Sequence, residues 1–400
     1  MKIRIKKVNT NEMIYFISYG LYLLFTILNT SFYAKYINGT LYKMILIICT
    51  CILIINEMIK SKYSVKKLIG LFITLLLFGI ILRVSNGIEG LTFALLILYV
   101  YCGCDIEFKK IAIFTLFVSV AIVGLVVISA KYGIILNYRS FTNGRIREYM
   151  GFRYALFPST YLFNVTALAI YIYKDKLNIW AFVVFTVINY YFYTKTNSRI
   201  TFALAISLLI ISFFGKKIFD FLLERKIVGI ICIFSYIISA VVSYEITKKY
   251  NSTISWMWSL NKFLGDRLRL GQISLEKYGV TLFGSKITWI GNGLDVSGNK
   301  ISGTYTWVDS LYIQILQHYG VLFLGVFLII ITFALYRIYK AKEYHLLMIL
   351  VAIAFHSIID DLSLYLYYNT FWIPVGFYLI ESTNFRKNSR KIQFKRKRIY

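Results

Sequence analysis

Long apolar runs separated by short polar breaks extend over most of the chain. About twelve such runs can be marked, and most approach the roughly 20 residues that a helix needs to cross about 30 Å of hydrocarbon. Their apolar residues do not alternate with polar ones, so the pattern predicts helices rather than the strands of a membrane barrel. The runs are 13–28, 41–55, 68–82, 91–102, 111–130, 154–173, 179–193, 200–214, 227–243, 311–336, 344–359 and 362–380.

Two runs, 91–102 and 200–214, are short for a full crossing. Each is either a span completed by its flanks or a re-entrant segment, so the expected topology has ten to thirteen spans. The first run follows four basic residues and has no small-residue cleavage site after it, which indicates an uncleaved helix rather than a signal peptide. We expect an all-α polytopic membrane protein with about twelve transmembrane helices. Residues 1–380 would form one transmembrane domain, and residues 381–400 a basic cytoplasmic tail.

The composition agrees with this prediction. Hydrophobic residues make up 58% of the 400 residues and charged residues only 16%. Soluble domains carry roughly 25% charged residues, so a soluble α/β enzyme is excluded. An aromatic content of 18% excludes a disordered chain, and five Cys are too few to hold a chain of this length by disulfides.

The formal net charge is +27, and its meaning depends on which side of the membrane the charges lie. With the N-terminus in the cytoplasm and twelve alternating spans, 27 of the 45 Lys and Arg residues fall inside and both termini are cytoplasmic. Thirteen of the 18 outside residues lie in two loops, 131–153 and 244–308, the second of which precedes the tenth span. The tail at 381–400 is most simply an anchor on acidic headgroups.

The two basic outer loops have two interpretations. Long loops can be translocated regardless of their charge. Alternatively, they bind an anionic ligand, and the arginine content of the first loop favours phosphate because a guanidinium pairs with phosphate through two parallel hydrogen bonds. The basic residues of this loop are Lys131, Arg139, Arg145, Arg147 and Arg153, and its one acid is Glu148.

Further candidates stand at the outer ends of predicted helices. Arg199 follows a short polar break and either extends to the membrane surface or faces the bundle as a functional residue. Arg267 and Arg269 lie in a predicted helix over 266–278, and residues two apart do not share a helix face, so at most one of them points at a ligand. Asp309 precedes a predicted long helix and is either a helix cap or a general base. Aromatic residues suited to stacking on sugars surround it, namely Tyr305, Trp307 and Tyr312.

Other chemistry has little support in the sequence. Asp360 and Asp361 are adjacent and point in different directions, which argues against a carboxylate pair. We find no clustered metal-ligand spacing and no nucleotide-binding motif, so we expect neither a metal nor a cofactor. The five Cys are interpreted as small packing residues.

Short segments in a fixed order carry a family resemblance. They are LNKFLGDRLRLG (260–271) followed by YGVTLFG (278–284), TNSR (196–199), Arg147 with MGF (150–152), VDSLY with QHYG (308–320), and YNTF (368–371). In this order and spacing they are similar to the motifs of the Wzy-type polysaccharide repeat-unit polymerases, relatives of the O-antigen ligases. The resemblance covers roughly residues 131–380. Where the ligases usually carry His-Asn, this chain has Asp309 and Ser310.

The resemblance implies a polymerase in the cytoplasmic membrane of a bacterium that acts on undecaprenyl-pyrophosphate-linked oligosaccharides as donor and acceptor. Flippase and chain-length regulator proteins would be its partners, together with the lipid bilayer, and nucleic acid would not be. Arg199 and Arg267 would bind the pyrophosphate, and Asp309 would accept the proton of the acceptor hydroxyl or orient the sugar. The assisting residues would be Arg145 and Arg147 for the pyrophosphate, and Tyr305, Trp307 and Tyr312 for the sugar rings.

Three alternatives remain open from the sequence. A ligase of the same superfamily would move finished polysaccharide to another acceptor. A flippase or other transporter of lipid-linked oligosaccharide would place charges at the membrane midplane and often shows repeat symmetry, neither of which is visible here. A structural or receptor protein with a basic outer loop would tolerate the loss of Arg199.

Overall fold

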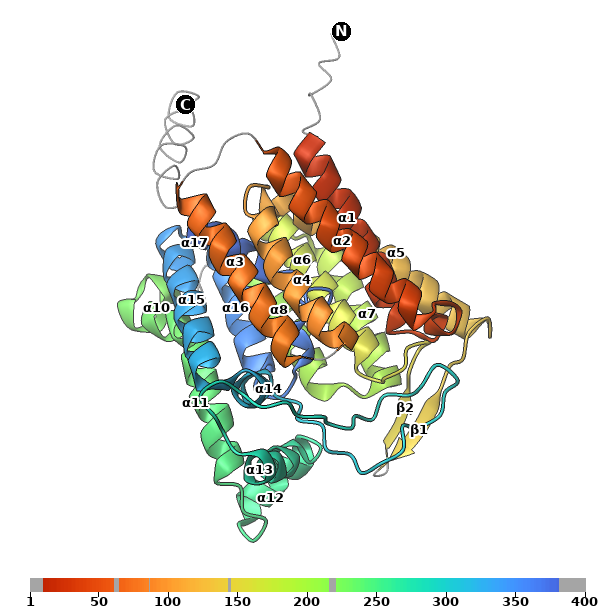
Figure 1. Cartoon of the computed structure of the whole chain (residues 1–400). Helices are drawn as coiled ribbons and strands as arrows, with labels where there is room; N and C mark the ends of the chain where they lie inside the picture. Colours follow the sequence, from red (N-terminus) through yellow and green to blue (C-terminus); the bar gives the residue numbers. More distant parts are fainter. Residues whose placement is uncertain (1–9, 61–64, 86, 143–144, 216–220, 381–400) are drawn as a thin grey trace.

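The computed structural model describes residues 10–60, 65–85, 87–142, 145–215 and 221–380. Within these ranges helices make up nearly all of the regular structure (Figure 1), so the prediction of an all-α membrane protein is confirmed at this level. The predicted cytoplasmic tail at 381–400 lies outside the described residues.

Apolar helices form a bundle. They are α1 (Thr10–Asn29), α2 (Gly39–Ile59), α3 (Val65–Val84), α4 (Gly87–Gly103), α5 (Phe108–Lys131), α6 (Phe157–Tyr173), α7 (Ile179–Thr196), α8 (Arg199–Phe213), α10 (Lys226–Ile233), α11 (Ser235–Lys248), α14 (Leu311–His318), α15 (Gly320–Lys340), α16 (Tyr344–His356) and α17 (Trp372–Ile380). The 3-10 turns are η1 (Phe32–Tyr36), η2 (Lys174–Lys176) and η3 (Leu362–Leu364).

Helix α6 lies at the centre of the bundle. Every residue from Pro158 to Ile170 is buried, and the helix packs against α5, α7, α8 and α16. Its proline stands in the first turn, where the missing N–H interrupts no helical hydrogen bond. Thr370 satisfies the side chain of the polar Asn164. The Thr370 hydroxyl accepts from Asn164 Nδ2 at 3.0 Å, and the Thr370 backbone N–H donates to Asn164 Oδ1 at 3.2 Å. The core is therefore continuous across the middle of the bundle.

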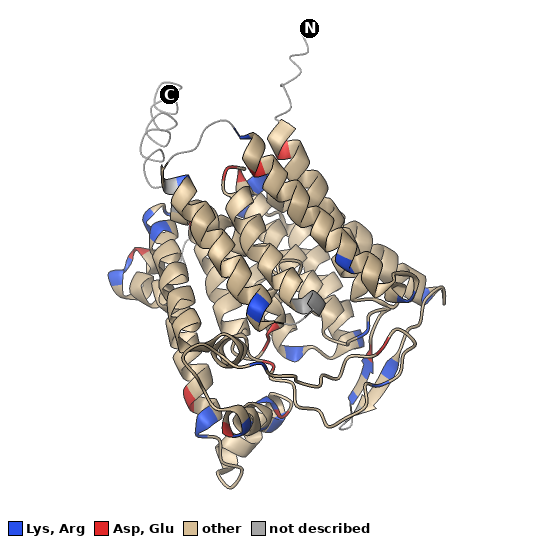
Figure 2. Ribbon diagram, in the orientation of Figure 1, with Lys and Arg blue, Asp and Glu red and all other residues tan. Residues whose placement is uncertain are grey.

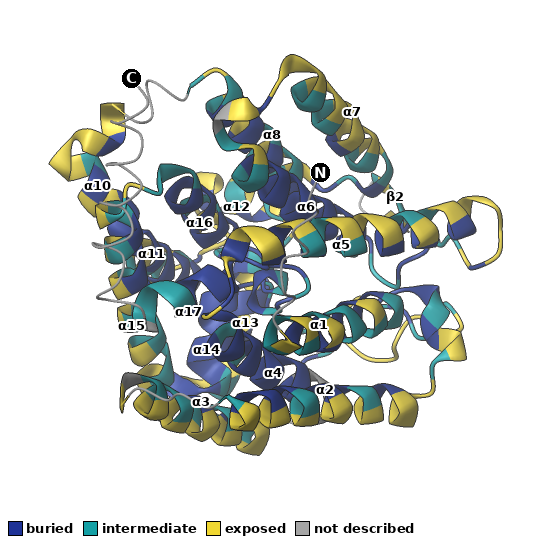
Figure 3. Cartoon of the chain, turned by 90° about the horizontal axis from the view of Figure 1, so that it is seen from above, coloured by how far each residue is buried: buried dark blue, intermediate teal, exposed yellow. Residues whose placement is uncertain are grey.

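Figure 3 shows exposed residues around a buried centre. On the outward faces of the bundle many of the exposed residues are large and apolar. Phe117, Trp180 and Ile329 are 69%, 76% and 69% exposed. Such a surface suits lipid and not water. Among the described residues, five helices are long and apolar enough to cross a membrane, namely α1, α2, α3, α5 and α15. A sixth span results if α10 and α11, which meet at 60°, are one bent crossing.

The structure corrects the predicted long helix over 311–336. The chain forms α14 and then turns at Gly320, whose φ is +88°, before continuing as α15. A loop segment docks across this break: the Val321 N–H donates to the Thr281 carbonyl at 3.0 Å. A Cβ at Gly320 would lie only 2.4 Å from the backbone nitrogen of Gly284. Gln317 and His318 are only a short polar interruption between two apolar stretches, so the hydrophobic pattern does not reveal the break.

The predicted span at 362–380 is also only partly helical. After η3 the chain is irregular up to α17, which begins at Trp372. The Ser363 carbonyl accepts from the Asn369 Nδ2 at 3.2 Å and from the Trp372 Nε1 at 2.8 Å. Irregular backbone is tolerated at membrane depth where it is buried in protein and its polar groups are satisfied.

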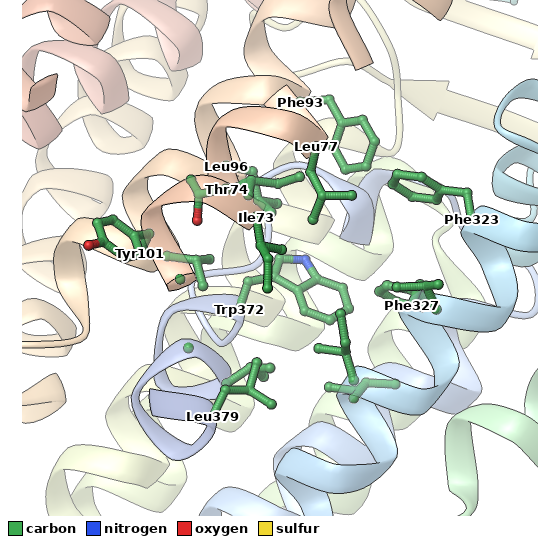
Figure 4. Close-up of a pocket in the computed structure, with 18 of the residues that line it drawn as sticks. Ile73, Thr74, Leu77, Phe93, Leu96, Tyr101, Phe323, Phe327, Trp372 and Leu379 are labelled. Atoms are coloured by element: carbon green, nitrogen blue, oxygen red, sulfur yellow. The ribbon is translucent and has the colours of Figure 1, made fainter. Parts of the chain in front are cut away.

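An apolar cavity of about 530 Å³ lies between α3, α4, α15 and α17. Figure 4 shows side chains such as Leu77, Phe93, Phe327 and Trp372 lining it. It shares no described lining residue with the polar cavities treated below.

The two long polar loops fold at one end of the bundle, opposite the start of α1 (Figure 1). The first forms an antiparallel hairpin of β1 (Arg139–Thr142) and β2 (Arg145–Glu148). The second forms α12 (Ser255–Phe263) and α13 (Arg267–Tyr278), followed by irregular chain up to α14. The predicted helix over 266–278 is thus confirmed. Figure 2 shows Lys and Arg residues on these elements, so basic side chains collect at this loop end.

Candidate functional site

Segments far apart in the sequence meet at the loop end around a cavity of about 110 Å³, which we call the inner cavity. A second cavity of about 620 Å³, the outer cavity, shares part of its wall. The hairpin, the α7–α8 turn, the α12–α13 turn and the ends of α14 and α16 contribute to the inner cavity. The residues that line both are Arg145, Arg147, Tyr154, Gly265, Asn292 and Tyr305.

Arg267 and Asp309 form an ion pair in the inner cavity. Arg267 Nε donates to Asp309 Oδ2 at 3.2 Å, and the hydroxyl of Tyr305 donates to the same oxygen at 2.9 Å. The side chains of Arg267 and Asp309 are 18% and 10% exposed. Within the described part of the chain, the Nε bond is the one hydrogen bond of the Arg267 side chain, so its terminal nitrogens face the cavity with donors to spare.

Backbone geometry aims Arg267 at this partner. Gly265 and Asp266 both adopt positive φ values, +73° and +67°, just before the helix begins. Burial is the largest single influence on the Arg267 guanidinium and lowers its pKa, but Asp309 together with Tyr154, Asp360 and Tyr305 raises the pKa overall. Arg267 therefore stays charged at any working pH.

The hairpin presents two arginines to the same space. Side chains alternate between the faces of a strand, so Arg145 and Arg147 share a face of β2 while Glu148 lies on the other. Both arginines line both cavities. The Glu148 carboxylate is paired with Lys195 at 3.2 Å and Arg139 at 3.7 Å. The one acid of this loop thus does not neutralise the cavity-facing arginines.

The α7–α8 turn contributes Arg199 and two unsatisfied polar groups. Asn197 is left-handed, with φ 55°, and ends α7; Arg199 is the first residue of α8. A hydrogen bond of 2.7 Å between the Thr196 and Ser159 hydroxyls holds the turn against α6. Asn197 Oδ1 and Ser198 Oγ are buried without a partner, yet both residues line the inner cavity. Since buried polar groups rarely remain unpaired, this arrangement points to a polar ligand.

The lining has an excess of positive charge. Arg145, Arg147, Arg199 and Arg267 face the inner cavity together with Asp309 and one further acid, Asp360. Burial and then the nearby charges of Arg199 and Arg147 lower the pKa of Arg145, which reflects how close these guanidinium groups are. A site of this kind favours a multiply charged anion such as a diphosphate.

Asp360 and His356 are the site residues that the sequence interpretation missed. His356 Nε2 lies 3.4 Å from Asp360 Oδ2 and 3.1 Å from the Thr201 hydroxyl, and all three residues line the inner cavity. Asp360 and Asp361 do not form a pair, because Asp361 turns away from the cavity and accepts from Gln314 Nε2 at 2.9 Å. What the sequence interpretation missed is that Asp360 shares a cavity with Asp309, a residue of another element.

The structure does not bring all of the predicted sugar-stacking residues to the cavities. Tyr305 lines both. Tyr312 is 1% exposed and donates to the Ala354 carbonyl at 2.9 Å, so it is a core residue and does not stack on a ligand in this structure. Trp307 packs edge-on against Trp289 and lines neither cavity. Arg269 is exposed and lines only the outer cavity.

The comparisons with known proteins add no relative. No family model matches the chain, and no curated protein and no solved structure matches it. Among the described residues, no group of three or more His, Cys, Asp or Glu side chains is placed to hold a metal ion.

Proposed function

We propose that this protein is a membrane glycosyltransferase that polymerises undecaprenyl-pyrophosphate-linked oligosaccharide repeat units into a capsular or O-antigen-type polysaccharide. The observation that carries the proposal is the meeting of four arginines, from three separate parts of the chain, around Asp309 at the loop end of a membrane bundle. The motifs that resemble the Wzy-type polymerases supply Asp309 and three of these arginines, Arg147, Arg199 and Arg267.

The arginines suit the leaving group of this reaction. When the bond between the sugar and the pyrophosphate breaks, negative charge grows on the departing phosphate oxygen. Preorganised cations in a partly desolvated site stabilise such charge more than water does. In the proposed complex, Arg199 and Arg267 bind the pyrophosphate and Arg145 and Arg147 extend the contact from the hairpin. The unpaired groups of Asn197 and Ser198 are further partners for the donor.

The larger outer cavity suits the sugars. Its lining combines Tyr149, Tyr154 and Tyr305 with several glycine residues. Tyrosine rings pack on sugar faces while their hydroxyls form hydrogen bonds. Asp309 lines the inner cavity, and its partner Tyr305 lines both cavities. Oriented by Tyr305 and Arg267, Asp309 serves to orient the acceptor or to take its proton.

The proposal also fixes a topology and a location. The bundle would cross the cytoplasmic membrane of a bacterium about twelve times, with both termini inside and the loop end outside. Repeat units would then arrive from a flippase, and a chain-length regulator would limit the polymer.

A deletion strain tests this function against its neighbours. Loss of a polymerase leaves single repeat units on the lipid carrier at the outer face. Accumulation of lipid-linked polymer would identify a ligase, and repeat units retained at the inner face would identify a flippase. Either of these last two results would contradict the proposal.

A further inference from the structure

Two carboxylates from different elements face the inner cavity, and their surroundings differ. Asp309 Oδ2 already accepts hydrogen bonds from Arg267 and Tyr305. Asp360 follows α16, is 4% exposed, and is held by one backbone bond, from the Leu362 N–H to its Oδ1 at 2.7 Å. Its other oxygen, Oδ2, faces the His356 Nε2 at 3.4 Å. Asp309 Oδ2 is thus paired with a cation, whereas Asp360 Oδ2 has an imidazole beside it.

We propose that Asp360, supported by His356, is the general base of the site, and that Asp309 positions Arg267. This inference rests on the proposed function. The oxygen of the acceptor hydroxyl attacks the anomeric carbon of the donor, its proton moves to the Asp360 carboxylate, and the bond from that carbon to the pyrophosphate breaks. Undecaprenyl pyrophosphate leaves with the electron pair, and no oxidant or other reactant is needed.

The geometry assigns His356 a positioning role. It is 2% exposed, and its Nε2 lies between the Thr201 hydroxyl and the carboxylate of Asp360. An imidazole next to a carboxylate orients it and passes its proton onward after the transfer.

The surroundings of Asp360 raise the pKa of its carboxyl group. Burial, the largest influence, raises its pKa, and the proximity of His356 and Arg267 reduces that rise without cancelling it. Asp309 acts in the same direction as burial. The other titratable groups that line the same cavity are Arg145, Arg147, Arg199, Tyr154 and Tyr305.

The test uses purified full-length protein, a lipid-linked repeat unit and the pH dependence of kcat/KM. A general base contributes on the order of 10²–10⁴ in rate, so Asp360→Asn should lose that factor while retaining affinity for undecaprenyl pyrophosphate. Asp360→Glu should recover part of the rate, and His356→Gln should displace the acid limb of the profile. Asp361→Asn is the matched control: it changes the adjacent buried acid that points away from the cavity and should leave kcat/KM within about twofold.

The outcomes separate this inference from the proposed function. If the wild type polymerises and Asp360→Asn does so at the same rate, Asp360 is not the base although the function stands. A uniform loss at all pH values in both Asp360→Glu and His356→Gln, with an unmoved acid limb, would show a structural role and overturn the inference. A wild type with no transfer activity would overturn the proposed function and this inference with it.

Discussion

Replacing Arg267 with lysine separates the two tasks proposed for its guanidinium, which are pairing with Asp309 and binding the pyrophosphate. Arginine has five N–H donors, of which the Nε donor is engaged by Asp309, leaving the terminal nitrogens for a ligand. A lysine ammonium is a point charge with three donors on a flexible stem. It can pair with Asp309 or reach a diphosphate, but it does not hold the fixed fork needed for both.

The size of the effect follows from the loss of one preorganised donor group. Such a loss typically costs on the order of 10²–10³ in rate, or about 2.7–4 kcal/mol of transition-state stabilisation. We expect Arg267→Lys to lower kcat/KM by this amount and Arg267→Ala to lower it at least as much.

Initial rates of chain extension on a defined lipid-linked repeat unit measure this loss. The matched control is Lys277→Ala, which removes an exposed cation from the same helix α13. Lys277 lines neither cavity. It should retain activity within about twofold. If Arg267→Lys, inserted and folded as the wild type, keeps more than half of the wild-type kcat/KM, Arg267 does not stabilise the leaving group.

The two faces of the hairpin predict different effects on the rate of chain extension. Arg147→Ala should reduce this rate about 10–100-fold because it removes a charged hydrogen-bond donor, whereas Arg139→Ala should not reduce it. Equal rates in the two variants would show that the hairpin does not bind substrate. Gly320→Ala should destabilise the protein by about 1–3 kcal/mol, because at φ +88° the new Cβ would meet backbone atoms. Gly325 has open space around it, so Gly325→Ala should leave the stability unchanged. Thermal unfolding in detergent measures the stability of both variants. Burial raises the pKa of Asp361 well above 3.8, so the folded state binds its proton more tightly than the unfolded chain does. The free energy of unfolding should therefore fall as pH rises from about 3.8 toward the raised pKa, and Asp361→Asn should lose this dependence in pH-dependent unfolding curves; an unchanged dependence would place the titration elsewhere.

The helical class and the regions that form the site were predictable from the sequence. Continuous apolar runs indicate helices in lipid, and the arginines stood out because they interrupt the usual charge asymmetry of short outer loops. The strand alternation that gives Arg145 and Arg147 a common face follows from their spacing of two, once a hairpin is assumed.

The helix break at Gly320 was not predictable from local pattern. It depends on a segment about 40 residues earlier in the chain, whose backbone docks against the turn and leaves no room for a side chain. The same long-range packing decides the place of Tyr312. An aromatic residue near a polar loop can stack on a sugar or fill the core, and only the position of the neighbouring helices shows that this tyrosine is in the core.

The place of Asp360 in the inner cavity was missed for a related reason. Adjacent acids diverge along a helix end, and that local rule holds here, since Asp361 bonds to Gln314. The carboxylate that shares a cavity with Asp360 belongs instead to Asp309, some 50 residues earlier in the chain. Local spacing does not report such a meeting of distant elements.

The most direct test of the central claim uses purified protein in lipid vesicles with a single lipid-linked repeat unit as both donor and acceptor. The account predicts a ladder of products spaced by one repeat unit, with one undecaprenyl pyrophosphate released for each glycosidic bond formed, and with both signals lost together in Arg267→Ala. Release of undecaprenyl pyrophosphate without chain extension, or an equal ladder from Arg267→Ala, would contradict it.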